Sequence, residues 1–275
     1  MFSLTSDQIN NYNNNGYLAP INVLTKDEAS EVRAEIEKIE KLWPNELDGL
    51  GRNYVHMISP VFDKVCHSTK ILDAVESIIG KNILVGGTTL FIKNPDKKGF
   101  VSFHQDAKYI GLEPHNWVTA WIAITDSNEE NGCMRMLTSS HKNNLPYHAQ
   151  KFDEGNLLTR GQTVENVPIE RTTPVILQAG QMSLHHPTII HGSGLNNSND
   201  RRIGFVVQSY IGSDVEQVLG KIYVQQARGD DKFKYHQHTK RPTKLMQKID
   251  IEVRQKANNE LSKIFYSGSK KIGKY

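Results

Sequence analysis

Residues 83–94 read ILVGGTTLFIKN, residues 117–124 read WVTAWIAI and residues 202–211 read RIGFVVQSYI. These stretches are rich in β-branched and aromatic residues, which is typical of strands. Residues 173–177 and 181–191 are two further strand candidates. Turns rich in proline, glycine and asparagine separate the candidates. Several short strands joined by polar turns predict a mainly β fold, a cupin-like double-stranded β-helix (jelly roll) with a jacket of helices.

The flanking segments carry helix signals. Thr5 begins a run of N-cap residues for a short helix that ends near Gly16. A second helix is predicted from Thr25, with apolar residues three or four positions apart, and Pro44 stops it. Two more helices are expected, over about 70–79 and about 243–265.

We predict one domain over residues 1–275, because no repeat or low-complexity linker interrupts the chain. The N-terminal helices would occupy about 5–80 and the jelly-roll core about 83–212. A C-terminal helical segment would fill about 213–275.

Composition narrows the class of protein. A net charge of +3 over 275 residues gives no reason to expect nucleic acid as a partner. Two cysteines exclude a disulfide framework and fit reducing surroundings. The chain shows no secretory signal and no run of ~20 apolar residues, so we expect a cytoplasmic protein with no membrane contact. The oligomeric state is left open.

The excess positive charge gathers toward the C-terminus. A solvated basic tail is the simplest interpretation, and a weak contact with an anion is the alternative. The residues concerned are Lys240, Arg241, Lys244, Lys248, Lys270, Lys271 and Lys274.

The segment FHQD carries His104 and Asp106 two positions apart. In a strand, alternate side chains point to the same face, so this imidazole and this carboxylate would point together. Such a pair suits one metal ion, with Gln105 pointing away unless the strand bends. Taken alone, the tripeptide is weak evidence.

A second histidine-rich segment, LHHPTIIHGSG, supplies a third ligand. His185, His186 and His191 compete for the position, and we favour His191 because it precedes a Gly-Ser-Gly turn. Two histidines and one carboxylate with open positions are diagnostic of non-haem iron(II) oxygenases. Zinc accepts the same ligands but prefers a nearly closed tetrahedron.

An arginine follows about one hairpin later. Arg202 shares a strand face with residues 204, 206 and 208, and Gly204 leaves space beside it. A guanidinium facing a barrel interior needs an anion, and the far carboxylate of 2-oxoglutarate would fit its planar fork. Arg201 is the competing candidate.

The ordered motifs HQD with Tyr109, TAWIA from Thr119, NGCMR from Asn131, SSH from Ser139 and HGSG with Arg202 resemble the phytanoyl-CoA dioxygenase (PhyH) family over roughly residues 8–212. The resemblance implies a double-stranded β-helix that binds iron(II) and 2-oxoglutarate and uses O2 for hydroxylation, releasing succinate and CO2. One departure is Thr138-Ser139-Ser140-His141, where relatives usually have Pro-Gly-Ser-His.

The resemblance also implies roles for individual residues. The metal ligands would be His104, Asp106 and His191, and a carboxylate at Asp106 argues against halogenation. Arg202 and Ser193 would hold the far carboxylate of 2-oxoglutarate. The cosubstrate pocket would be lined by Thr119 and Trp121, and the substrate would be met by Gln105, Tyr109, Asn196 and Gln208.

The sequence around the site resembles family members that hydroxylate small polar metabolites, including aminoalkylphosphonates. Lys93, Lys108 and Arg135 are candidates for meeting an anionic head group. The alternatives are a hydroxylase of an acyl-CoA or amino-acid-like substrate, a cupin-like metal-binding protein without oxygenase activity, and a zinc hydrolase. No HExxH element supports the last.

Overall fold

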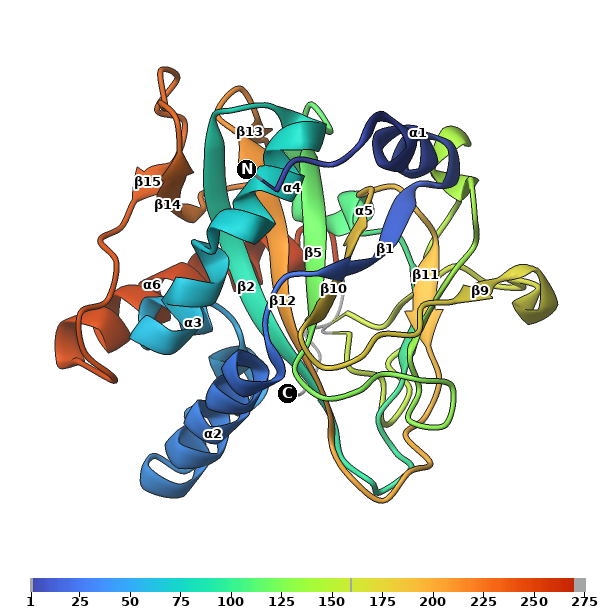
Figure 1. Cartoon of the computed structure of the whole chain (residues 1–275), viewed down its shortest axis with the longest axis horizontal. Coiled ribbons are helices and arrows are strands. Elements are labelled where there is room, and N and C mark those ends of the chain that lie inside the picture. Colours follow the sequence, from blue (N-terminus) through green and yellow to red (C-terminus); the bar gives the residue numbers. More distant parts are fainter. Residues whose placement is uncertain (1, 159, 270–275) are drawn as a thin grey trace.

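The centre of the computed structural model, which describes residues 2–158 and 160–269, is a seven-stranded sheet (Figure 1). Its middle strand, β12, pairs antiparallel with both β2 and β5, so the strands predicted over 83–94, 117–124 and 202–211 lie side by side at the centre of the sheet. The order across the sheet is β1 (Tyr17–Asn22), β10 (Gln181–His185), β5 (Trp117–Ala123), β12 (Arg202–Gly212), β2 (Ile83–Lys93), β14 (Tyr223–Arg228) and β15 (Gln237–His238).

A second sheet of four strands faces part of the first. Its order is β3 (Val101–His104), β11 (His191–Ser193), β6 (Met134–Met136) and β9 (Thr173–Pro174). Two short pairs complete the strands, β4 (Leu112–Glu113) with β13 (Glu216–Gln217) and β7 (Ala149–Gln150) with β8 (Gln162–Thr163). The two larger sheets are the layers of a jelly roll, as predicted.

Alternation along β12 separates two interiors. Ile203, Phe205 and Val207 belong to the main apolar core beneath the helices. The intervening Arg202 and Val206 face the opposite side, where a cavity lies between the two sheets. One face of this strand therefore stabilises the fold and the other supplies the site.

Helices cover the outer face of the large sheet. They are α1 (Ser6–Asn15), α2 (Lys26–Leu42), α3 (Pro60–Cys66) and α4 (Thr69–Ile79). The short α5 (Ala107–Ile110) and α6 (Lys248–Phe265) pack on the opposite side, where Ile264 joins Leu84 and Ile211 in a second apolar cluster. Four 3-10 turns lie at Gly49–Arg52, Val55–Met57, Ser140–Lys142 and Ile169–Arg171. The helices predicted from Thr5, from Thr25 and over 70–79 are confirmed, whereas α3 is additional.

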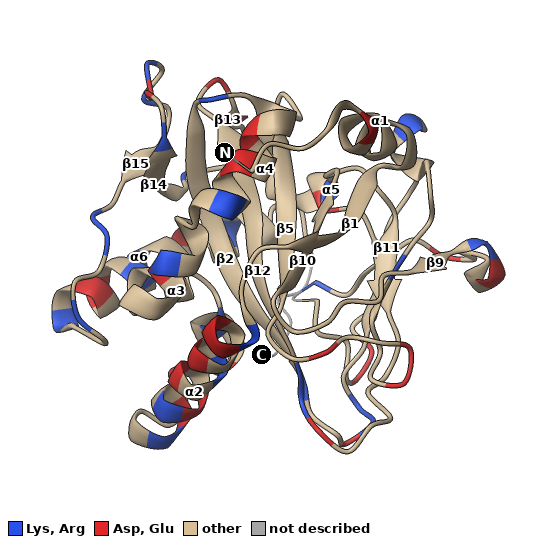
Figure 2. Ribbon diagram, in the orientation of Figure 1, with Lys and Arg blue, Asp and Glu red and all other residues tan. Residues whose placement is uncertain are grey.

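Helix α2 was predicted correctly because its apolar residues, three or four positions apart, lie on one side of the helix. Its Val32, Ile36 and Ile39 are buried in the main core. Charged side chains of both signs occupy the rest of the helix (Figure 2). An apolar stripe opposite a charged face fixes which side of a helix packs on the protein.

Three of the predicted boundaries are wrong. The segment 213–275 does not begin as a helix, because β14 pairs with β2 and extends the large sheet, and α6 starts only at Lys248. The expected strand over 181–191 is two strands in different sheets. Proline has no N–H to donate, so the ladder is interrupted at Pro187. Only residues 173–174 of the 173–177 candidate are strand.

The C-terminal basic residues do not all behave as a solvated tail. Arg241 forms an ion pair with the buried carboxylate of Asp63. Lys270, Lys271 and Lys274 lie outside the described residues. Cys66 and Cys133 are buried free thiols. Among the described helices, none has the length and apolar character required to cross a bilayer.

The N-terminal cap of α2 gives a test of the fold. Thr25 Oγ1 accepts a hydrogen bond from the Glu28 N–H, and the Glu28 carboxylate accepts one from the Thr25 N–H. Thr25→Ala removes one of these bonds and should lower the free energy of unfolding by about 1 kcal/mol. Thr25→Ser keeps the hydroxyl and is the control. Equal urea midpoints for Thr25→Ala and the unchanged chain would contradict this role of the cap.

Candidate metal centre

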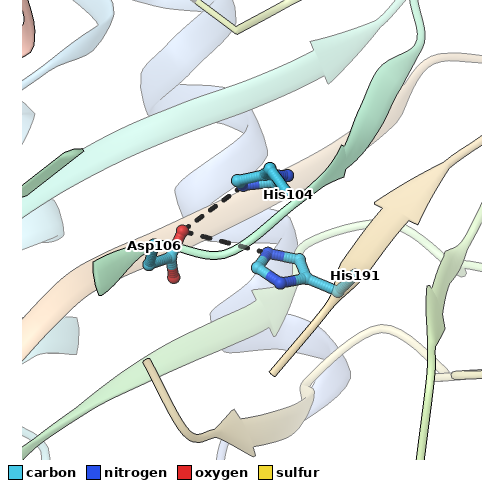
Figure 3. Close-up of side chains that lie close together, drawn as sticks. All are labelled: His104, Asp106 and His191. Atoms are coloured by element: carbon cyan, nitrogen blue, oxygen red, sulfur yellow. Dashed lines mark ion pairs between the residues drawn. The ribbon is translucent and has the colours of Figure 1, made fainter. Parts of the chain in front are cut away.

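Three side chains from two adjacent strands and the following turn converge between the sheets (Figure 3). Ligand atoms of His104, Asp106 and His191 all lie within 4.8 Å of one another. His104 ends β3 and His191 begins β11, and the antiparallel register places them directly opposite each other. Their ring centroids are 4.2 Å apart.

Asp106 reaches the site by a different route from the one expected. Strand β3 ends at His104, and Asp106 has helical backbone angles (φ −59°, ψ −43°) at the start of α5. The turn, rather than strand alternation, therefore swings the carboxylate toward the two imidazoles. Gln105 points elsewhere, since its buried amide donates to the Thr188 carbonyl.

Both imidazoles are oriented by the backbone. His104 Nδ1 lies 2.9 Å from the Ser102 carbonyl oxygen, and His191 Nδ1 lies 3.1 Å from that of Ile189. Carbonyls only accept, so each Nδ1 carries the proton and donates it. Each Nε2 is left with a lone pair directed at the carboxylate, which is the arrangement of a metal-ligating histidine.

The two oxygens of Asp106 have different surroundings. Oδ1 lies 3.4 Å from His104 Nε2 and 3.9 Å from His191 Nε2, so it faces the position that a metal ion would occupy. Oδ2 faces the opposite way, 2.9 Å from Thr119 Oγ1. Burial by itself would raise the pKa of Asp106, but the surrounding histidines hold it well below its usual range. The site therefore presents an ionised carboxylate.

The surroundings of Arg202 indicate whether the cavity could bind the far carboxylate of 2-oxoglutarate. Its side chain is buried, and its Nε and Nη1 atoms have no hydrogen-bond partner among the described residues. Burial lowers its pKa to about 10. The guanidinium carbon lies 5.2 Å from the centre of the Trp121 ring. A buried cation with free donors requires an anion, and a planar carboxylate matches its fork.

Arg201 is engaged elsewhere. Its guanidinium binds both carboxylate oxygens of Glu40 on α2, at 2.9 and 2.6 Å. Of the two arginines left open by the sequence, the structure places only Arg202 in the cavity wall.

Gly204 makes room for Trp121. A Cβ added at Gly204 would overlap the Trp121 ring, so no larger residue fits without moving it. The space beside Arg202 that the sequence suggested is thus filled by the indole. Together Gly204 and Trp121 set the position of the guanidinium.

Ser193 lies beside a second buried cation. Lys93 Nζ donates to Ser193 Oγ at 2.7 Å and to the Gly132 carbonyl at 3.2 Å, and it also contacts the Gly194 carbonyl. Burial and the nearby Arg202 charge lower the pKa of Lys93 to about 6. Because Lys93 uses a lone pair of the Ser193 hydroxyl, that hydroxyl keeps its own proton to donate.

The cavity has a volume of about 740 Å³. Its wall includes the three ligand candidates and, of the other candidates implied by the resemblance, Arg202, Ser193, Thr119, Trp121, Tyr109 and Gln208. Gln105 and Asn196 do not line it, and Asn196 instead donates to the Lys93 and Asp200 carbonyls.

The cations proposed for an anionic head group also lie elsewhere. Lys93 is buried behind Ser193, Lys108 is exposed on α5, and Arg135 pairs with Glu129. Sequence reasoning missed Arg52, which does line the cavity. It lies in an irregular segment whose position no periodic pattern reveals. Residues 156–158 were missed for the same reason, and Phe265 was missed because only tertiary folding brings the end of α6 to the cavity.

His185 was also passed over as a ligand, and it lines the cavity next to the triad. Its ring centroid lies 4.7 Å from that of His191.

Comparison with known proteins places this geometry in a family. The profile of the phytanoyl-CoA dioxygenase (PhyH) family matches residues 12–204. Peroxisomal phytanoyl-CoA dioxygenase of Mus musculus is 28% identical over 223 residues, which cover 72% of this chain and 66% of that protein. A probable alpha-ketoglutarate-dependent hypophosphite dioxygenase of Stutzerimonas stutzeri is 27% identical over 168 residues, covering 60% of this chain and 58% of that one. The chain thus spans about two thirds or less of the length of these relatives.

Solved structures agree with the sequence comparison. The non-heme monooxygenase ThoJ superposes with a TM-score of 0.83 at 28% identity, covering 94% of this chain and 97% of that one. CytC3 with Fe(II) and alpha-ketoglutarate shares the fold, with a TM-score of 0.67 at 18% identity over 86% of this chain and 93% of that one. The fold, the facing histidines with their carboxylate, and the family profile over most of the chain lead to one conclusion: this protein belongs to the phytanoyl-CoA dioxygenase (PhyH) family.

Proposed function

We propose that the chain is an iron(II)- and 2-oxoglutarate-dependent dioxygenase that hydroxylates a small, polar, anionic metabolite and releases succinate and CO2. One observation carries the proposal. A two-histidine, one-carboxylate triad and a buried guanidinium with free donors line the same cavity. The triad suits iron(II) with open positions, and the guanidinium suits a dicarboxylate bound to it.

Each residue has a definite task in this proposal. His104, Asp106 and His191 would hold iron(II), and Arg202 with Ser193 would hold the far carboxylate of 2-oxoglutarate. Bound together, iron(II) and 2-oxoglutarate supply the oxidising power that transfers oxygen from O2 to a C–H bond. The chain itself would orient the cosubstrate through Trp121 and Thr119, which line the cavity beside the triad.

Arg52 supports an anionic substrate. Its Nε donates to the Leu47 carbonyl at 3.0 Å, which fixes the side chain in the cavity wall. It forms no ion pair within residues 2–158 and 160–269, and burial lowers its pKa although the nearby charges of Asp48 and Glu40 oppose that shift. A partly buried guanidinium without a paired carboxylate favours an anionic ligand. The likeness to a probable hypophosphite dioxygenase is consistent with a small anion.

Asp48 adds the opposite charge to the same wall. A substrate with an anionic group and an ammonium group, such as an aminoalkylphosphonate, would meet Arg52 with the first and Asp48 with the second. Tyr109 and Gln208 line the wall nearer the metal position and would contact the carbon skeleton and its polar substituents.

The cofactor assignment can be tested before the substrate is known. Anaerobic addition of iron(II) and 2-oxoglutarate should give a weak visible absorption band, and Asp106→Ala should remove it. With a panel of aminoalkylphosphonates, amino acids and acyl-CoA thioesters, succinate release should depend on His104 and Asp106. Near-normal turnover by His104→Ala or Asp106→Ala would reject the assignment.

Substitutions of the neighbouring Arg201 and Arg202 provide a control and a test for the proposed cosubstrate site. Arg202→Ala should raise the KM for 2-oxoglutarate on the order of 10- to 100-fold, because charged hydrogen bonds in a buried site are lost. Arg201→Ala removes a partly exposed ion pair and should leave this KM unchanged, with at most ~1 kcal/mol of stability lost. Steady-state succinate release measures both. Equal effects of the two substitutions would contradict the assignment of Arg202.

Arg52 tests the substrate class. Arg52→Gln should raise the KM for an anionic substrate roughly 10-fold or more while leaving the KM for 2-oxoglutarate unchanged, because Arg202, and not Arg52, is assigned to the cosubstrate. Lys108→Gln, a change at an exposed cation outside the cavity, is the control. If Arg52→Gln left the ranking of anionic and neutral substrates unaltered, the proposed anion contact would be wrong.

A further inference from the structure

His185 is a buried side chain whose two ring nitrogens lack hydrogen-bond partners among the described residues. It ends β10, opposite Thr119 in the neighbouring strand β5. The residue is 1% exposed, and neither ring nitrogen makes a hydrogen bond of normal geometry with the part of the chain that the structure describes. An imidazole that is dehydrated on burial and left unpaired destabilises the folded chain. A buried histidine in this condition, in the wall of an active-site cavity, calls for an explanation.

His185 lies beside the outer oxygen of a metal-ligand candidate. His185 Nε2 lies 3.4 Å from Asp106 Oδ2. The inner oxygen, Oδ1, faces His104 and His191 instead. His185 is not part of the group whose ligand atoms lie within 4.8 Å of one another, so we assign it no direct ligand role.

The other donor near Oδ2 cannot satisfy it alone. Thr119 Oγ1 lies 2.9 Å from Asp106 Oδ2 and also 2.9 Å from the Gln208 carbonyl oxygen. A threonine hydroxyl has a single proton, so it can donate to only one of these acceptors at a time. Whenever Thr119 donates to Gln208, the ionised outer oxygen is left with His185 as its donor.

We propose that His185 is a positioning residue of the metal centre. With its proton on Nε2, it donates to Asp106 Oδ2 and holds the carboxylate so that only Oδ1 faces the metal ion. Restricting Asp106 to one ligating oxygen keeps a further coordination position free for the cosubstrate. The inference rests on the proposed iron site and adds to it a residue that acts through Asp106.

The consequence is a measurable dependence of metal affinity on a side chain that does not touch the metal. Partners of metal ligands typically contribute 10- to 100-fold to affinity. His185→Phe keeps a flat ring of similar size but cannot donate. We expect it to weaken metal binding on the order of 10-fold. His185→Gln can place an amide N–H near the position of Nε2 and should recover most of that affinity.

The experiment uses Mn(II) as the probe, because the electron paramagnetic resonance signal of free Mn(II) reports binding without turnover. The unchanged protein, His185→Phe, His185→Gln and Asp106→Ala are titrated in parallel, and circular dichroism melts confirm that each is folded. Weaker binding by His185→Phe with recovery in His185→Gln supports the proposal. Unchanged affinity in His185→Phe, or equal losses in both His185 variants, overturns it in favour of a packing role.

Asp106→Ala separates this inference from the proposed function. If Asp106→Ala binds Mn(II) as tightly as the unchanged protein, the metal site itself is wrong and the inference falls with it. If Asp106→Ala loses binding while His185→Phe retains it in full, the proposed function stands and only the role of His185 is rejected.

Discussion

Arg202 and Lys93 are the only charged residues in the four central strands β10, β5, β12 and β2, and the antiparallel register places them opposite each other. Both side chains are buried. Burial beside the Arg202 guanidinium lowers the pKa of Lys93 to about 6, so Arg202 is the charge that this dehydrated interior has to accommodate. A buried charge opposes folding unless an anion joins it. Lys93 is stabilised by backbone carbonyls and the Ser193 hydroxyl, whereas Arg202 keeps free donors that point to an anionic ligand. The interior between the sheets is therefore organised around a negative charge that the chain itself does not supply.

The same strands stabilise the fold and hold the site at once. On β12, alternate residues enter the apolar core beneath the helices, and the intervening ones face the cavity. On the smaller sheet, pairing of β11 with β3 sets His191 opposite His104 at a centroid distance of 4.2 Å. Because both histidines lie at strand ends fixed by hydrogen-bonded ladders, little conformational entropy remains to be lost when a metal ion binds. Rigid placement of this kind is what a binding site of defined geometry requires.

Sequence patterns predicted the parts of this structure that depend on local chemistry. The capping residue Thr25, the alternation in 202–211 and the ordered histidine motifs each act over a few positions, so they can be read from the chain. The turn that carries Asp106 was misjudged as strand, since two residues on one face of a strand and two residues across a tight turn look alike in sequence. Arg52 and Phe265 were missed because they come from irregular or distant segments that only tertiary folding brings to the cavity. The substrate wall is built mostly from such segments, so substrate identity is the part least accessible to sequence reasoning.

Each of the three metal-ligand candidates is held in place by neighbouring polar groups. His104 and His191 are tied through Nδ1 to backbone carbonyls, which fixes each Nε2 toward the centre. Asp106 turns one oxygen to the centre and the other to Thr119 and His185. The backbone carbonyls thus limit rotation of the imidazoles, and Thr119 and His185 limit rotation of the carboxylate. An iron ion held by the triad would have open coordination positions in the cavity that Arg202 also lines. A cosubstrate anchored at its far carboxylate by Arg202 would present its other end to those positions. The distance between the two ends, rather than any single contact, would then select a dicarboxylate of the right length.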